Sequence, residues 1–242
     1  TASLRQHPRP PRRLRVMICD TTFTGAAIHP EVKAAVHQAG RLLESLGHRV
    51  EPGRPQADVP MMMRAWTDIV GVGTALSVRK ALKGRDAAGL VEGVSRGAMA
   101  HAETLHPTRY LEAVGEIHAF GRQMAAVFGE GPGDGPDIIL SACLAEPPAK
   151  VGRFSHETED YLAYRIGPGG IFEYSPFCAV FNASGQPAAS VPLGWSEGDL
   201  PIGVHLAARF GADEELIALC AEIERAAPWA GMRAPMAGAG RS

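Results

Sequence analysis

The spacing of apolar residues changes along the chain, and each change marks a predicted element. Residues 14–19 (LRVMIC) form a short, mainly apolar run of the kind found in a buried strand. From Pro30 onward, apolar residues recur three and four positions apart, which predicts an amphipathic helix that ends before Gly47. A second short strand is expected at residues 48–52 (HRVEP). This order predicts a βαβ unit, and therefore an α/β fold with a largely parallel sheet.

The middle of the chain is mostly helical in pattern. Residues 58–128 show helical spacing, and breaks are expected near Gly84, Gly97 and Pro107. The segment GVGTAL (residues 71–76) resembles a dinucleotide-binding loop, but it lacks a third glycine and does not follow a strand, so we expect no nucleotide there. The next elements, in chain order, are a turn-rich loop (129–136), a short strand (137–142) and an irregular loop (146–152).

The last part of the chain predicts a helix, two strands and a closing helix. Residues 171–185 have helical spacing and end at Gly185, a residue type suited to the left-handed end of a helix. Two short β runs, residues 187–193 and 200–208, flank the segment GWSEGD. Residues 211–229 combine a first turn rich in acidic residues with an apolar stripe, which predicts an amphipathic helix.

Composition bounds the class of protein and its partners. The chain has 242 residues, of which 45% are hydrophobic and 21% are charged, which is enough to bury one large core or two small ones. A formal net charge of −2 gives no reason to expect nucleic acid as a partner, and no apolar run is long enough to expect a membrane span. Residues 1–13, rich in arginine and proline, are expected to be a solvated linker, and residues 231–242 a flexible tail.

The cysteines and histidines predict no cofactor and no metal site. Four cysteines lie far apart without a CxxC pair, and the nine histidines show no HExxH or HxH pattern. The cysteines are expected to be buried thiols in a reducing compartment, which favours the cytoplasm.

The segment GWSEG fits the Gly-x-Ser-x-Gly pattern of a nucleophile elbow, with Ser196 as the candidate nucleophile. Such an elbow needs a strand that turns sharply into a helix, whereas the residues after Ser196 alternate like a strand and contain Pro201. The available partners, Asp199 and His205, would come from the same hairpin. We therefore interpret GWSEG as a hairpin turn.

Several motifs together resemble the amidase signature family. The pattern N-x-x-G-x-P-A-x-S-x-P is matched by Asn182, Gly185, Pro187, Ala188, Ser190 and Pro192, and the pattern L-P-x-G by residues 200–203. The family usually has glutamine at the position of His205. Residues 136–152 are similar to the strand and loop that line the acyl pocket of the family, and residues 14–230 resemble its C-terminal portion. Within the family, the resemblance favours amidases of aminohexanoate cyclic dimers and bacterial acylamidases.

The resemblance implies a mixed β-sheet flanked by helices and hydrolysis of the C–N bond of a carboxamide. The family uses a Ser–cis-Ser–Lys triad, yet the sequence has no adjacent serines, and none of its lysines (Lys33, Lys80, Lys83 and Lys150) matches the catalytic one. We therefore expect a C-terminal fragment without catalytic residues of its own, inactive alone. Whether the catalytic half was lost in the gene, by proteolysis or by design stays open.

Two interpretations of function follow. In the first, the chain shapes the acyl side of an amidase site and binds a small amide; the candidate substrate-binding residues are Ser141, Cys143, Pro176, Phe177 and Asn182. In the second, it is a non-catalytic remnant that binds a small ligand or another chain. Truncation would expose sheet edges, so self-association or a complementary chain is expected.

Overall fold

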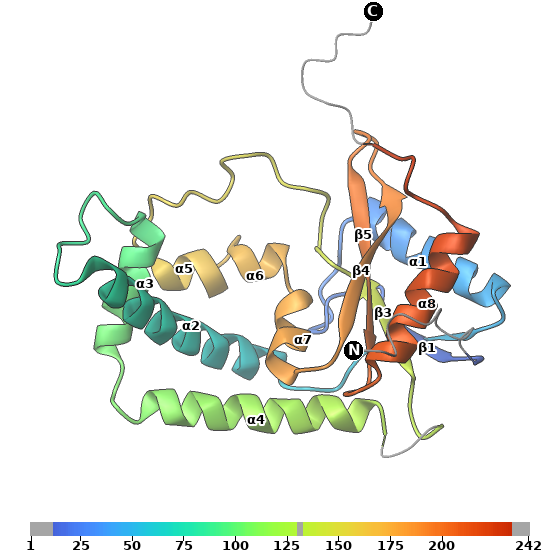
Figure 1. The fold of residues 1–242 in the computed structure, drawn as a ribbon, viewed down its shortest axis with the longest axis horizontal. Coiled ribbons are helices and arrows are strands. Elements are labelled where there is room, and N and C mark those ends of the chain that lie inside the picture. Colours follow the sequence, from blue (N-terminus) through green and yellow to red (C-terminus); the bar gives the residue numbers. More distant parts are fainter. Residues whose placement is uncertain (1–11, 130–132, 234–242) are drawn as a thin grey trace, which may run out of the picture.

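The computed structural model describes residues 12–129 and 133–233, and they form one five-stranded sheet with helices on both faces (Figure 1). The strands are β1 (Arg15–Ile18), β2 (Arg49–Pro52), β3 (Ile138–Ala142), β4 (Ala188–Trp195) and β5 (Pro201–Ala208). Their order is β2-β1-β3-β5-β4. β2, β1 and β3 are parallel, whereas β5 is antiparallel to both β3 and β4. The mixed sheet that the family resemblance implies is confirmed, and the parallel arrangement is limited to three strands.

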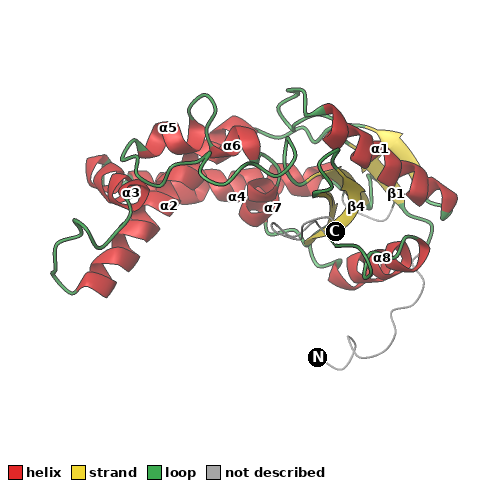
Figure 2. Ribbon diagram, turned by 90° about the horizontal axis from the view of Figure 1, so that it is seen from above, coloured by secondary structure: helices red, strands yellow, loops and turns green. Residues whose placement is uncertain are grey.

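Eight helices are present in the described residues: α1 (Pro30–Ser45), α2 (Val59–Leu82), α3 (Gly93–Thr104), α4 (Arg109–Val127), α5 (Tyr161–Ile166), α6 (Ile171–Tyr174), α7 (Cys178–Ser184) and α8 (Asp213–Ala226). Helices α1 and α8 lie on one side of the sheet (Figure 1). The other helices lie on the opposite side, where α2, α3 and α5 extend away from the sheet and give the molecule an elongated outline (Figure 2).

The predicted βαβ unit is confirmed. α1 begins with Pro30 as its first helical residue, and Gly47 follows its end with a φ of 91°, a value that favours glycine. Gly40 lies on the buried face of the helix, where a Cβ would come within 3.0 Å of Ile18 Cδ1. This close approach seats α1 on the parallel strands.

Two of the three predicted helix breaks are correct. α2 ends at Lys83 and Gly84, both with positive φ, and Pro107 lies between α3 and α4. The break near Gly97 is wrong, because Gly97 lies inside α3. A Cβ there would clash with the carbonyl oxygen of Glu159, so the glycine allows the backbone of residues 157–159 to lie against the helix.

The helix expected over residues 171–185 is two shorter helices, α6 and α7. Ser175, Pro176 and Phe177 separate them, because proline has no N–H to donate and the residue before a proline avoids helical dihedrals. Gly185 ends α7 with a φ of 77°, as the sequence predicts. The break places the start of α7 against the end of β3.

The ends of the chain are described only in part. Arg12, in the predicted linker, pairs through its guanidinium with Asp137 at 2.6 Å and with Glu215 at 3.2 Å. Residues 1–11 of the linker and 234–242 of the predicted tail lie outside the described residues. No described helix has the length and apolar character needed to cross a membrane.

Candidate functional site

A row of polar side chains crosses the sheet beneath α7. Ser141 of β3 pairs with His205 of β5, and His205 pairs with Ser190 of β4. Paired residues in neighbouring strands point to the same face, so these three side chains are neighbours on one face. The ring of Phe181, from α7, covers His205 at a centroid distance of 5.2 Å.

Cys143 lies at the solvent end of this row. It follows the last residue of β3 and is half-buried; its Sγ donates to Ser190 Oγ at 3.0 Å. Its backbone N–H donates to the carbonyl oxygen of Gly203 at 3.4 Å. A Cβ at residue 203 would come within 2.7 Å of Ser190 Oγ, so glycine at this position leaves room for the contact between the thiol and the hydroxyl.

A second thiol, which the sequence analysis does not identify as a site residue, completes the cluster. Cys178, the first residue of α7, is half-buried, and its Sγ donates to the carbonyl oxygen of Cys143 at 3.8 Å. A hydrogen bond with the Cys143 thiol lowers the pKa of Cys178 to about 7. The same hydrogen bond, together with burial, raises the pKa of Cys143. No periodicity pairs these cysteines, so sequence reasoning has no signal for their contact.

The other predicted substrate-binding residues lie in different environments. Ser141 is fully buried, and its hydroxyl donates to the carbonyl oxygen of Ala142 at 3.2 Å. Phe177 is also fully buried and packs edge-on against Phe23, with ring centroids 5.2 Å apart. Pro176 is buried beside it, whereas Asn182 is exposed on α7. Cys143 borders an open cavity, whose walls also include Glu146, Pro201 and Gly203.

His205 is a buried, neutral imidazole. It is 6% exposed, and burial lowers its pKa to about 4. Within the described part of the chain, its Nδ1 has no hydrogen-bond partner. At neutral pH the side chain therefore adds no charge to the row of polar residues.

The structure supports the interpretation of GWSEG as a turn. Ser196 follows β4, its N–H donates to the carbonyl oxygen of Leu200 at 2.9 Å, and its Oγ accepts from the Leu200 N–H at 3.1 Å. The segment leads into strand β5 and not into a helix. His205 lies four residues beyond Pro201, about 13 Å further along the strand. Ser196 thus lacks the helix that an elbow needs, and His205 lies too far away to act as its base.

Residues 12–129 and 133–233 contain no group of three or more acidic, histidine or cysteine side chains arranged to hold a metal ion. The polar cluster consists of the thiols of Cys143 and Cys178, the hydroxyl groups of Ser141 and Ser190, and the buried imidazole of His205.

Comparison with known proteins identifies the family. The profile of the family described as Amidase matches residues 4–217, most of the chain. The chain belongs to the amidase signature family. Among curated proteins, 6-aminohexanoate-cyclic-dimer hydrolase of Paenarthrobacter ureafaciens is 26% identical over 92% of this chain and 46% of its own length. AmiC of Mycobacterium tuberculosis is 28% identical over 96% of this chain and 49% of its own length.

Solved structures of amidase signature enzymes share the fold. A structure of 6-aminohexanoate cyclic dimer hydrolase matches with a TM-score of 0.84 and 26% identity, over 96% of this chain and 48% of that one. A bacterial aryl acylamidase matches with a TM-score of 0.69 and 21% identity, over 94% of this chain and 46% of that one. The chain thus spans about half the length of the amidases that it matches.

Proposed function

We propose that this chain forms one part of an amidase that hydrolyses the C–N bond of a carboxamide, and that it supplies a wall of the acyl-binding site. The observation that carries the proposal is the family match over residues 4–217, combined with a polar cluster at the carboxyl end of β3. In sheets of this kind, ligands bind beyond the carboxyl ends of the parallel strands.

The cluster suits binding better than bond cleavage. Cys143 and Ser190 offer a thiol and a hydroxyl that can orient a polar group of the substrate, and Pro201 and Ile202 offer apolar contacts in the adjoining cavity. Cleavage of an amide also needs an activated nucleophile and a proton for the leaving amine. No two serines are adjacent in the 242 residues, so we assign the nucleophile and the base to a complementary amidase segment.

Amides of 6-aminohexanoate and aryl acylamides are the proposed substrates. The support is the similarity to 6-aminohexanoate-cyclic-dimer hydrolase, together with the shared fold of the aryl acylamidase. The cytoplasm is the proposed location, because the four cysteines are free thiols.

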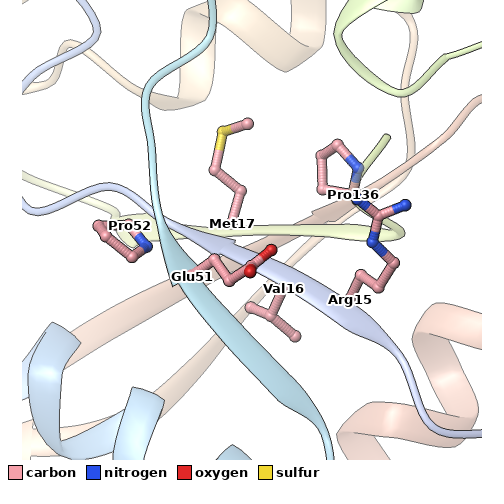
Figure 3. A pocket seen from close by; sticks show the side chains of 6 residues that line it. All are labelled: Arg15, Val16, Met17, Glu51, Pro52 and Pro136. Carbon is pink, nitrogen blue, oxygen red and sulfur yellow. The ribbon is translucent and has the colours of Figure 1, made fainter. Parts of the chain in front are cut away.

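The face of β1 and β2 that carries Met17 and Glu51 is the proposed contact surface for the complementary segment. Met17, Glu51 and Pro136 line a hollow there (Figure 3). Arg49 and Glu51 beside it are 61% and 48% exposed, and the buried Arg15 Nε finds no hydrogen-bond partner among residues that the structure describes. A segment that offers an acceptor to Arg15 would complete this face. Sedimentation that shows only a monomer would count against the alternative of self-association through the same surface.

The test is to express this chain together with a separate amidase segment that carries the Ser–cis-Ser–Lys triad. Hydrolysis of 6-aminohexanoate amides and aryl acylamides is expected, and a fluorophosphonate probe should label the added segment and leave Ser196 unlabelled. Cys143→Ala should raise KM with little change in kcat, because Cys143 is proposed to bind and not to react.

The half-buried Cys220 on α8 provides the matched control, since Cys220→Ala should leave both constants unchanged. An adduct on Ser196 would contradict the proposal. So would a folded assembly that binds amides without hydrolysing them, which would instead support a non-catalytic binding protein.

A further inference from the structure

Cys143 and Cys178 are brought together by the backbone around them. Between the two residues the chain forms the long loop after β3, then α5 and α6, before it returns at the start of α7. The N–H of Ala145 donates to the carbonyl oxygen of Tyr174 at 2.9 Å, which ties the outgoing and returning segments together. The fold therefore holds the two cysteines near each other from both sides.

The two cysteines lie beside each other, and both are only partly buried. The Sγ of Cys178 lies 3.8 Å from the carbonyl oxygen of Cys143, so the side chain of Cys178 lies beside residue 143. Neither side chain is fully buried, and Cys143 borders an open cavity. A small oxidant can thus reach the pair.

We propose that Cys143 and Cys178 form a dithiol site that hydroperoxides oxidise to an intramolecular disulfide. The proposed hydrolysis uses neither thiol as a nucleophile, so the site adds a chemistry that amide hydrolysis does not need.

The order of events follows from which sulfur is a thiolate. The pKa of Cys178, lowered to about 7, makes about half of this residue a thiolate at neutral pH, whereas Cys143 keeps its proton. The Cys178 thiolate attacks one oxygen of hydrogen peroxide; an S–O bond forms, the O–O bond breaks, and water leaves after protonation. The Cys143 sulfur then attacks the Cys178 sulfenic acid, the S–S bond forms, and the hydroxyl leaves with the Cys143 proton as a second water. The dithiol loses two electrons and the peroxide gains them.

The other two cysteines are poor competitors. Burial raises the pKa of Cys19 and of Cys220, so both remain thiols at neutral pH. Oxidation is therefore expected to be selective for one pair of the four cysteines.

A disulfide would also change the site in which Cys143 lies. The Cys143 sulfur would leave Ser190 Oγ, which is 3.0 Å away in the reduced protein, and would lose its proton. If the proposed function is correct, oxidation therefore alters substrate binding; this consequence alone rests on the proposed function, and the oxidation itself does not.

The test is to treat the protein with a stoichiometric amount of hydrogen peroxide and to follow free thiols, intact mass and non-reduced peptide maps. Two of the four thiols should disappear, with a mass loss of about 2 Da that dithiothreitol reverses. The map should show one cross-link, between Cys143 and Cys178. Cys143→Ser should give a sulfenic acid on Cys178 that dimedone traps, and Cys178→Ser should slow peroxide-dependent thiol loss by about tenfold.

Cys220→Ser is the matched control and should form the disulfide as fast as the unmodified chain. A different cross-link, or an undiminished rate in Cys178→Ser, would overturn the proposal. If circular dichroism shows that a variant is unfolded, the rate at which the unmodified chain is alkylated at Cys178 provides the test instead.

The rate of alkylation at Cys178 should rise with pH around a midpoint near 7, and a midpoint near the ordinary value of 9 would overturn the proposal. None of these measurements depends on amidase activity, so the two proposals can fail separately.

Discussion

His205 lies on β5 between two serines, Ser141 of β3 and Ser190 of β4. Burial lowers the pKa of its imidazole to about 4, against 6.5 for a solvated histidine. Between these values the unfolded chain binds a proton that the folded chain does not. The contribution of His205 to the free energy of unfolding is therefore fully present above pH 6.5. It is lost as the pH falls from 6.5 toward 4.

The expected size of this effect can be measured with His205→Gln. At pH 5 the unmodified chain should have lost about 2 kcal/mol of its free energy of unfolding through this one group, compared with pH 8. The His205→Gln variant should lose about 2 kcal/mol less of its free energy of unfolding between the two pH values, because glutamine does not titrate. Urea unfolding of both chains at the two pH values gives the comparison, and equal losses in both would show that His205 is accessible to protons in the folded state.

The site residues show what a sequence reveals at this scale. Ser196 is correctly interpreted as a turn residue because a turn is decided by its immediate neighbours. The placement of Cys143 after β3 is also local, since it follows the apolar run that predicts the strand. Cys178 is missed because its contact with Cys143 depends on how α7 packs over the sheet. The buried positions of Ser141 and Phe177 are likewise set by packing.

At the scale of elements, α3 is shaped by its neighbour as much as by its own sequence. Two of its glycines, Gly93 and Gly97, face the backbone of residues 157–159, and the Val94 N–H donates to the carbonyl oxygen of His156 at 3.0 Å. The glycines cost helix propensity but let the two backbones touch. The sequence shows the low helix propensity of the glycines but not their contact with the backbone of residues 157–159. For this reason the sequence predicts a break in the helix.

Gly97→Ala should therefore destabilise the protein. Alanine favours the helix by about 1 kcal/mol, but the Cβ would clash with the Glu159 carbonyl at a cost of up to about 3 kcal/mol, so a net loss of about 1–2 kcal/mol is expected. Gly73→Ala in α2 is the control, since a Cβ there meets no atom within 4 Å and should stabilise by up to about 1 kcal/mol. Chemical unfolding measures both, and equal effects at the two positions would contradict the packing role.

The elements that the sequence predicts well are those with a strong local period. α1 and α8 have one apolar face against the sheet, and their limits agree with the proline, glycine and acidic residues at their ends. Strand order is a different matter. The sequence suggests a parallel βαβ unit, but the neighbours of β3 and β5 are fixed by contacts between segments about 65 residues apart.

At the scale of the whole molecule, Asp137 links three distant parts of the chain. Its carboxylate is fully buried and accepts hydrogen bonds from the Arg12 guanidinium at 2.6 Å and from the Arg15 N–H at 2.8 Å; Arg209 lies 3.7 Å away. Burial alone would raise the pKa of Asp137, but the hydrogen bonds outweigh it and lower the pKa. Arg12 also reaches Glu215 of α8, so the first described residue joins β3 to the last helix.

Arg12→Ala should weaken this link. The buried carboxylate would lose its nearest cation, and a loss of about 1–2 kcal/mol in the free energy of unfolding is expected once the half-exposed position of Arg12 is taken into account. Arg13→Ala, at the neighbouring exposed position, should change stability by less than about 0.5 kcal/mol. Thermal unfolding of the two variants provides the measurement, and similar melting temperatures would contradict the role of Arg12.

The ion pair at Asp137 also sets a rule for cutting and tagging the chain. A protease site or affinity tag placed ahead of residue 12 leaves Arg12 free to reach Asp137 and α8. Cleavage between Arg12 and Leu14 separates Arg12 from the domain and leaves the buried carboxylate of Asp137 without this cation. Limited proteolysis with a trypsin-like enzyme, which cleaves after arginine, should therefore be slow at Arg12 in the folded protein. Protection of this bond would report directly on whether Arg12 is still paired with Asp137 and Glu215.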